Sequence, residues 1–173
     1  MTHPHREFNI DRVPLGYLIT FRAYGTWLHG DSRGSVDRFH SLYGSPLIPP
    51  NRRWRQYNER ALKRPPVKLT ARRRAAIEAA IRETCKTRQW RLWAINARTN
   101  HVHSVVTANR DPEIVLNAFK ANATRKMKEA GCWQGGHTPW VKNGSKRRLW
   151  NEQDLMEAIV YVEYEQGEPL PQV

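Results

Sequence analysis

The positions of the hydrophobic residues divide the chain into strand-like and helix-like segments. Residues 17–24 are rich in β-branched and aromatic side chains and predict a first strand. Two further runs of this kind, 90–97 and 101–107, are separated by the short turn 98–100. Their closeness in sequence predicts an antiparallel hairpin. A fourth strand is expected around residues 146–150.

Three segments have the apolar spacing of amphipathic helices, and each follows a residue type that commonly caps a helix. The expected caps are Thr70, Asp111 and Asn151. We expect the first helix to end near Arg88, the second just before Gly131 and the third near Gln166. Pro112 directly follows the second cap, at the position where proline is favoured in helices.

The predicted order of elements is β-α-β-β-α-β-α. Its first six elements match the ferredoxin-like split β-α-β arrangement, an α+β fold with a four-stranded antiparallel sheet and two helices on one face. The last helix is an additional C-terminal element. We expect residues 15–168 to form one domain between a polar leader, 1–14, and a tail, 169–173. Residues 25–69 are interpreted as a long basic loop, and loops of this length are often functional.

The charge of the chain points to a polyanionic partner. The formal net charge is +13, while 39% of the residues are hydrophobic and 10% are aromatic, as in folded globular proteins. So many cations indicate binding to nucleic acid, with the aromatic residues as stacking surfaces for unpaired bases. Neither a signal-peptide pattern nor a run of roughly 18 apolar residues is found, which predicts a soluble, cytoplasmic protein without a membrane partner. Cys85 and Cys132 have neither metal-type nor disulfide-type spacing.

The motif His101-Val102-His103 lies at the start of a predicted strand. Because side chains alternate across a strand, both imidazoles lie on one face and Val102 lies on the other. Two imidazoles on one face can share a divalent cation. An oxygen ligand from elsewhere in the chain would then be needed to complete the coordination shell.

The predicted C-terminal helix carries two tyrosines in different positions. At about 100° per residue, the apolar residues of this helix form one stripe, with Tyr161 on its flank and Tyr164 pointing away from it. Glu165 lies four residues after Tyr161 and is therefore its neighbour on a helix, whereas Gln166 points towards the stripe. Tyr161 is thus favoured over Tyr164 as a half-buried functional residue.

The histidine pair on a central strand and the late helix with a tyrosine resemble the HUH single-tyrosine transposases. This family includes transposases of the 200/605 insertion-sequence group and the REP-associated tyrosine transposases. The resemblance spans roughly residues 15–168. It implies that His101, His103 and a polar residue four positions after the tyrosine bind a divalent metal, Mg²⁺ or Mn²⁺. Tyr161 would then be the nucleophile and Glu165 the third ligand.

The sequence departs from the family pattern at the third ligand, which is commonly Gln or Asn. Here the fourth position after Tyr161 is Glu165, and Gln166 follows directly, so that both stay candidates. Tyr164 remains a lesser candidate for the nucleophile. The resemblance implies cleavage and rejoining of single-stranded DNA, at hairpin-containing ends, through a 5′-phosphotyrosine intermediate. It also implies a bacterial or archaeal, nucleoid-associated protein, with a homodimer as an open alternative.

Clusters of cations and aromatic residues outside the motif are candidates for DNA binding. The residues proposed for this role are Arg33, Arg38, Arg52, Arg53, Trp54, Lys146, Arg147 and Arg148. Cations on the second predicted helix, Lys120 among them, are a further group. Arginine binds phosphate bidentately, and cations interleaved with aromatic residues are typical of single-strand binders.

Two other functions remain in competition. A catalytically inactive or domesticated DNA-binding protein would have the same fold and charge but no cleavage activity. A nickase of the replication-initiator or relaxase type would share the histidine pair. The short chain and the position of the pair ahead of a single late tyrosine disfavour that second alternative.

Overall fold

The computed structural model describes residues 13–35 and 46–171. The described elements follow one another in the order β1, α1, α2, β2, β3, α3, β4, α4. The strands are β1 (Gly16–Arg22), β2 (Arg91–Ala97), β3 (His101–Thr107) and β4 (Ser145–Leu149). The helices are α1 (Arg52–Arg60), α2 (Ala71–Arg88), α3 (Pro112–Glu129) and α4 (Glu152–Tyr164).

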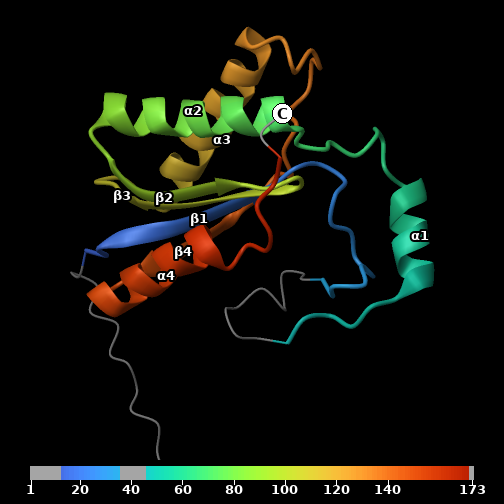
Figure 1. Ribbon diagram of the computed structural model, residues 1–173. Coiled ribbons are helices and arrows are strands. Elements are labelled where there is room, and N and C mark those ends of the chain that lie inside the picture. The colour runs from blue at the N-terminus through green and yellow to red at the C-terminus, as the bar shows by residue number, and fades with distance from the viewer. Residues whose placement is uncertain (1–12, 36–45, 172–173) are drawn as a thin grey trace, which may run out of the picture.

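The four strands form one antiparallel sheet in the order β2-β3-β1-β4. Helices α2 and α3 pack together on one face of this sheet, and α4 lies across the other face (Figure 1). This is the predicted ferredoxin-like α+β fold with an additional C-terminal helix. Strand β3 lies between two neighbours, so the histidine motif sits within the sheet rather than at its edge.

Each face of the sheet has its own hydrophobic core. The larger core lies under α2 and α3 and includes Phe21, Ile77 and Phe119. The smaller core lies under α4 and includes Val105 of β3 and Val162 of α4. Alternation along β3 therefore directs Val102 and Val106 to the larger core and the histidines to the face that α4 partly covers.

The predicted helix caps are confirmed. The side chains of Thr70, Asp111 and Asn151 each accept a hydrogen bond from a backbone N–H in the first turn of α2, α3 and α4. These bonds satisfy donors that would otherwise have no partner at a helix start. The C-terminal boundary of α4 differs from the prediction, because the helix ends at Tyr164 rather than near Gln166.

The segment 25–69 is not wholly irregular, since it contains the helix α1. No residue of α1 is buried, and the helix stands away from the sheet (Figure 1). Its sequence lacks the apolar stripe by which a packed helix is recognised, so the pattern of hydrophobic residues did not reveal it. Asn51 caps α1, and its N–H donates to the carbonyl of Gly30 at 3.1 Å, which links the helix to the earlier loop.

Among the described helices, none combines the length and the apolar character that a membrane span requires.

Candidate functional site

The site is built around the two histidines of β3. Their rings lie 4.5 Å apart between centroids, on the sheet face beneath α4. In β1, Thr20 is the register partner of His103, and Arg22 is the register partner of His101. Register partners share a face in an antiparallel pair, so these two side chains border the histidines. The predicted common face of His101 and His103 is confirmed by this arrangement.

Each histidine has a partner at its Nδ1 atom. The Nδ1–H of His101 donates to the Asn100 Oδ1 atom at 2.6 Å, because an amide oxygen can only accept. The Nδ1 atom of His103 lies 2.7 Å from the Thr20 hydroxyl oxygen. In a neutral ring, a protonated Nδ1 leaves the lone pair on Nε2. In metal sites, a hydrogen bond at one ring nitrogen commonly fixes the orientation of a histidine ligand, and Asn100 and Thr20 are placed to do this here.

Burial favours the neutral form of both imidazoles. Burial is the main cause that lowers the pKa of His103 to about 3, and the neighbouring charges of His101 and Arg22 act in the same direction. Burial also lowers the pKa of His101, although the Gln166 amide oxygen favours its protonated form. Neutral imidazoles with available lone pairs are the form that binds a cation.

Gln166 supplies an oxygen atom beside the pair. Its side-chain NH₂ donates to the Tyr161 carbonyl oxygen at 2.8 Å, which turns the amide oxygen towards His101. The Oε1 atom then lies 3.5 Å from the His101 Nε2 atom. Because the Nδ1 atom carries the proton of a neutral His101, these two facing atoms both present lone pairs. A cation bound by both atoms would remove the repulsion between these lone pairs. Two imidazole nitrogens and one amide oxygen form a donor set that fits a divalent metal.

Glu165 is not brought to the histidines. It lies beyond the last residue of α4 and is exposed, with its backbone N–H bound to the Tyr161 carbonyl oxygen at 3.3 Å. Glu165 is the C-cap residue and still lies one turn after Tyr161, as expected, but its side chain is directed to solvent. Gly167, with a φ of +80°, lies just beyond the helix end and is the signal that marks this boundary. Within the described residues, no three His, Cys, Asp or Glu side chains cluster to hold a metal.

The tyrosine that α4 presents to the histidines is Tyr161. Its ring packs edge-on against His103 at 5.4 Å between centroids, and 38% of the residue is exposed. Tyr164 is 75% exposed and has no ring contact with the pair. Position on the helix thus separates the two tyrosines in the way that the sequence predicted.

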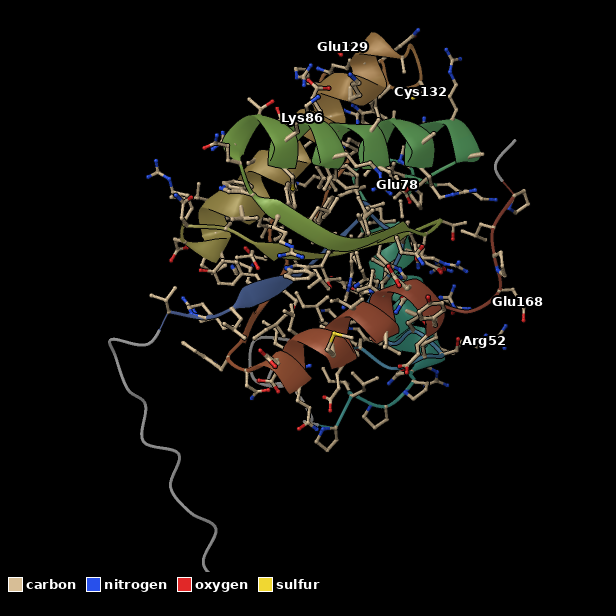
Figure 2. The ribbon with its side chains drawn as sticks, turned by 60° about the vertical axis from the view of Figure 1, so that its left-hand side comes forward. Arg52, Glu78, Lys86, Glu129, Cys132 and Glu168 are labelled. Atoms are coloured by element: carbon tan, nitrogen blue, oxygen red, sulfur yellow. The ribbon has the colours of Figure 1, made fainter. Side chains whose placement is uncertain are left out.

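The segment after α4 is tied to the opposite side of the sheet. The Arg98 guanidinium donates to the carbonyl oxygen of Glu168 at 2.9 Å, and Arg74 of α2 donates to that of Pro171. Figure 2 shows Glu168 on this segment, which leaves α4 in the direction of α2. In α4 itself, the Val162 carbonyl accepts from the Asn96 amide at 3.0 Å. These bonds fix the end of α4, and with it Tyr161 and Gln166, against the sheet.

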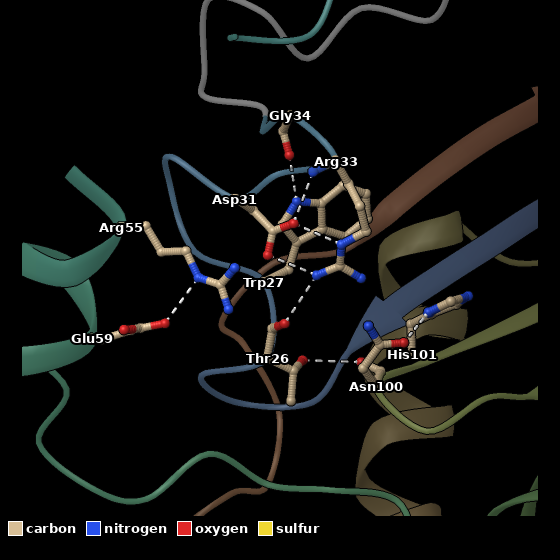
Figure 3. Close-up of polar contacts among 9 residues, drawn as sticks. All are labelled: Thr26, Trp27, Asp31, Arg33, Gly34, Arg55, Glu59, Asn100 and His101. Atoms are coloured by element: carbon tan, nitrogen blue, oxygen red, sulfur yellow. Dashed lines mark hydrogen bonds and ion pairs between the residues drawn. The ribbon is translucent and has the colours of Figure 1, made fainter. Parts of the chain in front are cut away.

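A loop at the end of β1 borders the site. The Thr26 hydroxyl donates to the carbonyl oxygen of Asn100 at 3.3 Å, which joins this loop to the turn before His101 (Figure 3). In the same loop, Arg33 binds both oxygens of the buried Asp31 carboxylate. Hydrogen bonds from Arg33 are the main cause that lowers the pKa of Asp31 to about 2.

The predicted DNA-binding residues lie in three places. Arg52, Arg53 and Trp54 are exposed on α1, where the Trp54 ring stacks on His29 at 4.9 Å. On β4, Lys146 pairs with Glu113, while the guanidinium groups of Arg147 and Arg148 lie 4.0 Å from the carboxylates of Asp154 and Asp111. Arg33 is occupied by Asp31, and Arg38 lies outside the described residues.

The interpretation of Lys120 as a surface cation of the second helix was wrong. Its ammonium group is buried and donates to the carbonyl oxygens of Val141, Lys142 and Asn143 at 2.8 to 3.1 Å. Burial is the main cause that lowers the pKa of Lys120. This lysine holds the loop before β4 and is not available to DNA.

Sequence reasoning missed two residues that line the site, Thr20 and Arg22. Both lie in the predicted first strand at alternate positions, so their common face was available from the pattern. What the pattern lacked was the pairing of β1 with β3, which sets them opposite the histidines.

No protein-family model matches the chain, and no curated protein sequence matches it. Among solved structures, a REP-associated tyrosine transposase bound to a REP hairpin is similar at 13% sequence identity, with a TM-score of 0.46. The match covers 94% of this chain and 70% of that one. Likeness at this level carries no weight for the function of this chain, which has to be inferred from its own residues.

Proposed function

We propose that this protein is a metal-dependent transposase that cleaves and rejoins single-stranded DNA through Tyr161. The observation that carries the proposal is the convergence of two neutral imidazoles, one amide oxygen and one half-exposed phenol on the same side of the sheet. The net charge of +13 supports a nucleic-acid substrate. The resemblance noted in the sequence, of the histidine motif and late tyrosine to the HUH single-tyrosine transposases, agrees with this.

The Nε2 atoms of His101 and His103 and the Oε1 atom of Gln166 would hold the divalent cation. When bound, this cation withdraws charge from a non-bridging oxygen of the scissile phosphate and lowers the barrier by several kcal/mol. Asn100 and Thr20 orient the two rings for this role. Imidazole nitrogen is a softer donor than Mg²⁺ prefers, so we expect Mn²⁺ to bind more tightly than Mg²⁺.

The reaction exchanges one phosphate ester for another. The Tyr161 oxygen attacks the phosphorus and forms a new O–P bond, and the bond from phosphorus to the 3′ oxygen breaks. The phenol proton is lost and the leaving 3′ oxygen gains one, so that the products are a 5′-phosphotyrosine and a free 3′-hydroxyl. Attack by the 3′-hydroxyl of another strand reverses these steps and restores the phenol. The ester energy is conserved, so no nucleotide cofactor is consumed.

The test uses a pool of fluorescent hairpin oligonucleotides with single-stranded flanks, incubated with protein and Mn²⁺. Covalent protein–DNA adducts are separated on a denaturing gel. We expect adducts with the wild type and with Tyr164→Phe, the matched control from the same helix, and none with Tyr161→Phe. Equal adduct from Tyr161→Phe would refute the assignment of the nucleophile. Wild-type protein that binds the hairpins and never forms adducts would instead be a DNA-binding protein without cleavage activity.

A further inference from the structure

Two guanidinium groups lie over the indole ring of Trp27 at the border of the site. The Arg22 Cζ atom lies 3.8 Å from the centroid of the Trp27 ring, and the Arg33 Cζ atom lies 4.9 Å from it. The Trp27 Nε1–H donates to the Gly34 carbonyl oxygen at 2.7 Å, which fixes the ring (Figure 3). The indole is therefore a rigid surface on which both cations rest.

The two arginines differ in what neutralises their charge. Arg33 donates to both oxygens of Asp31, at 2.7 and 2.8 Å, and also to the Thr26 carbonyl oxygen at 3.3 Å. Its role is to hold the loop. Among the residues that the structure describes, no carboxylate lies within ion-pair distance of Arg22. Within the described part of the chain, Arg22 thus carries a charge without a counter-ion, although it is only partly exposed to solvent.

Arg22 also borders the histidine pair from β1. It is the register partner of His101, and it shares a sheet face with His101, His103 and Thr20. A guanidinium whose carbon lies over an indole ring can keep N–H groups at its edge available. Those donors match the paired oxygens of a phosphate. Contact with the indole also limits the rotamers that the Arg22 side chain can adopt.

We propose that Arg22 binds the non-bridging oxygens of the DNA phosphodiester that is held at the histidine pair. The inference rests on the proposed function, since it assigns a phosphate to this site. Negative charge on these oxygens increases in the transition state of ester exchange. A fixed cation that faces them therefore stabilises the transition state more than the ground state. Arg22 is then a catalytic residue, and Trp27 positions it.

The first experiment measures the rate of adduct formation with the oligonucleotide pool and Mn²⁺ for Arg22→Gln and Arg22→Lys. The matched control is Arg82→Gln, which removes an exposed arginine of α2. We expect the rate to fall by about 100-fold or more in Arg22→Gln, the size of effect seen when one transition-state donor is removed. Arg82→Gln should keep the wild-type rate. Thermal unfolding of each variant shows whether it has kept its fold.

The second experiment needs no cleavage. Binding of the labelled oligonucleotides is followed by fluorescence anisotropy in EDTA over a range of salt concentrations. Loss of one phosphate contact lowers the slope of log affinity against log salt by about one. We expect this change in Arg22→Gln and the wild-type slope in Arg82→Gln. Arg22→Lys keeps the charge and loses the planar fork, so its slope should be normal and its adduct rate low.

The outcomes separate this inference from the proposed function. Wild-type protein that forms adducts, together with an Arg22→Gln variant of unchanged rate and unchanged slope, would overturn the role of Arg22 alone. Wild-type protein that forms no adduct, with a lowered slope in Arg22→Gln, would overturn the transposase activity and keep Arg22 as a phosphate contact. Absence of both adduct and slope change would overturn both.

Discussion

At the scale of single residues, the chemistry of the site depends on which atoms carry protons. The His101 Nδ1–H group donates a hydrogen bond to the Asn100 Oδ1 atom, and the Gln166 NH₂ group donates one to the Tyr161 carbonyl oxygen. The atoms left facing each other, the His101 Nε2 atom and the Gln166 Oε1 atom, are both acceptors. Two hydrogen bonds at the periphery thus leave two lone pairs facing each other, as the proposed metal site requires, and a proton on the His101 Nε2 atom would remove one of them.

This geometry predicts that Gln166 and Glu165 differ in their contribution to metal affinity. We expect Gln166→Ala to weaken Mn²⁺ binding by about 10-fold or more, because an oriented ligand is lost. Glu165→Ala is the matched control, with an exposed side chain, and should bind Mn²⁺ as the wild type does. Isothermal titration of each protein with Mn²⁺ measures the difference. The reverse order of affinities would restore Glu165 as the ligand.

The ion pair between Asp31 and Arg33 predicts a pH dependence of the loop beside the site. The folded-state pKa of Asp31 is about 2, below the ordinary value of 3.8, mainly because Arg33 donates hydrogen bonds to the carboxylate. The ionised carboxylate therefore stabilises the loop fully above pH 4, and this contribution is lost as the pH falls from about 4 to about 2. A carboxyl NMR titration should give the lowered pKa in the wild type and a value near the ordinary one in Arg33→Gln. An unchanged pKa in that variant would contradict the assigned cause.

At the scale of elements, α1 differs from the other helices because it buries no residue. Helices α2, α3 and α4 are stabilised by packing on the sheet, whereas α1 has its Asn51 cap and surface contacts such as the stacked Trp54 and His29 rings. A helix of this kind contributes little to the core. Its exposed arginines are available to a polyanion.

The double variant Arg52→Gln/Arg53→Gln tests this role for α1. We expect unchanged thermal stability, because neither side chain is buried, and a salt slope of DNA binding that is lower by about two. Arg82→Gln/Lys86→Gln removes the same charge from α2 and should leave the slope unchanged. Equal salt slopes in the two double variants would contradict a specific role of α1 in DNA binding, because the arginines of α1 would then act only through the net charge of the protein.

At the scale of the whole molecule, the larger hydrophobic core and the candidate site lie on opposite faces of the sheet. The larger core lies on the α2 and α3 side, and the histidines, Tyr161 and Gln166 gather on the side of α4. The segment after α4 crosses back to α2 and is held by Arg98 and Arg74. One chain therefore brings its own tyrosine to its own histidine pair.

This arrangement predicts that the tyrosine acts within its own chain. A mixture of Tyr161→Phe protein with His103→Ala protein contains both intact halves of the site, but never in one chain. We expect no covalent DNA adduct from such a mixture. Adduct in the mixture, and in neither protein alone, would show that Tyr161 acts in the site of a partner subunit.

The sequence by itself determined the features that local rules control. Strand periodicity gave the common face of His101 and His103, and capping residues such as Asn151 located the helix starts, because both depend on near neighbours in the chain. The helical angle also separated Tyr161 from Tyr164, since both lie inside the helix.

Only the tertiary structure decided which distant groups meet. Arg22 reaches the site through the pairing of β1 with β3, Lys120 is buried by the loop before β4, and Gln166 is turned inward where α4 ends. Helical spacing favoured Glu165, but its side chain is exposed at the C-cap of α4, whereas the Gln166 Oε1 atom faces His101. Strand pairing, burial and helix termination are set by the free energy of the whole fold, and local patterns of hydrophobic residues do not contain them.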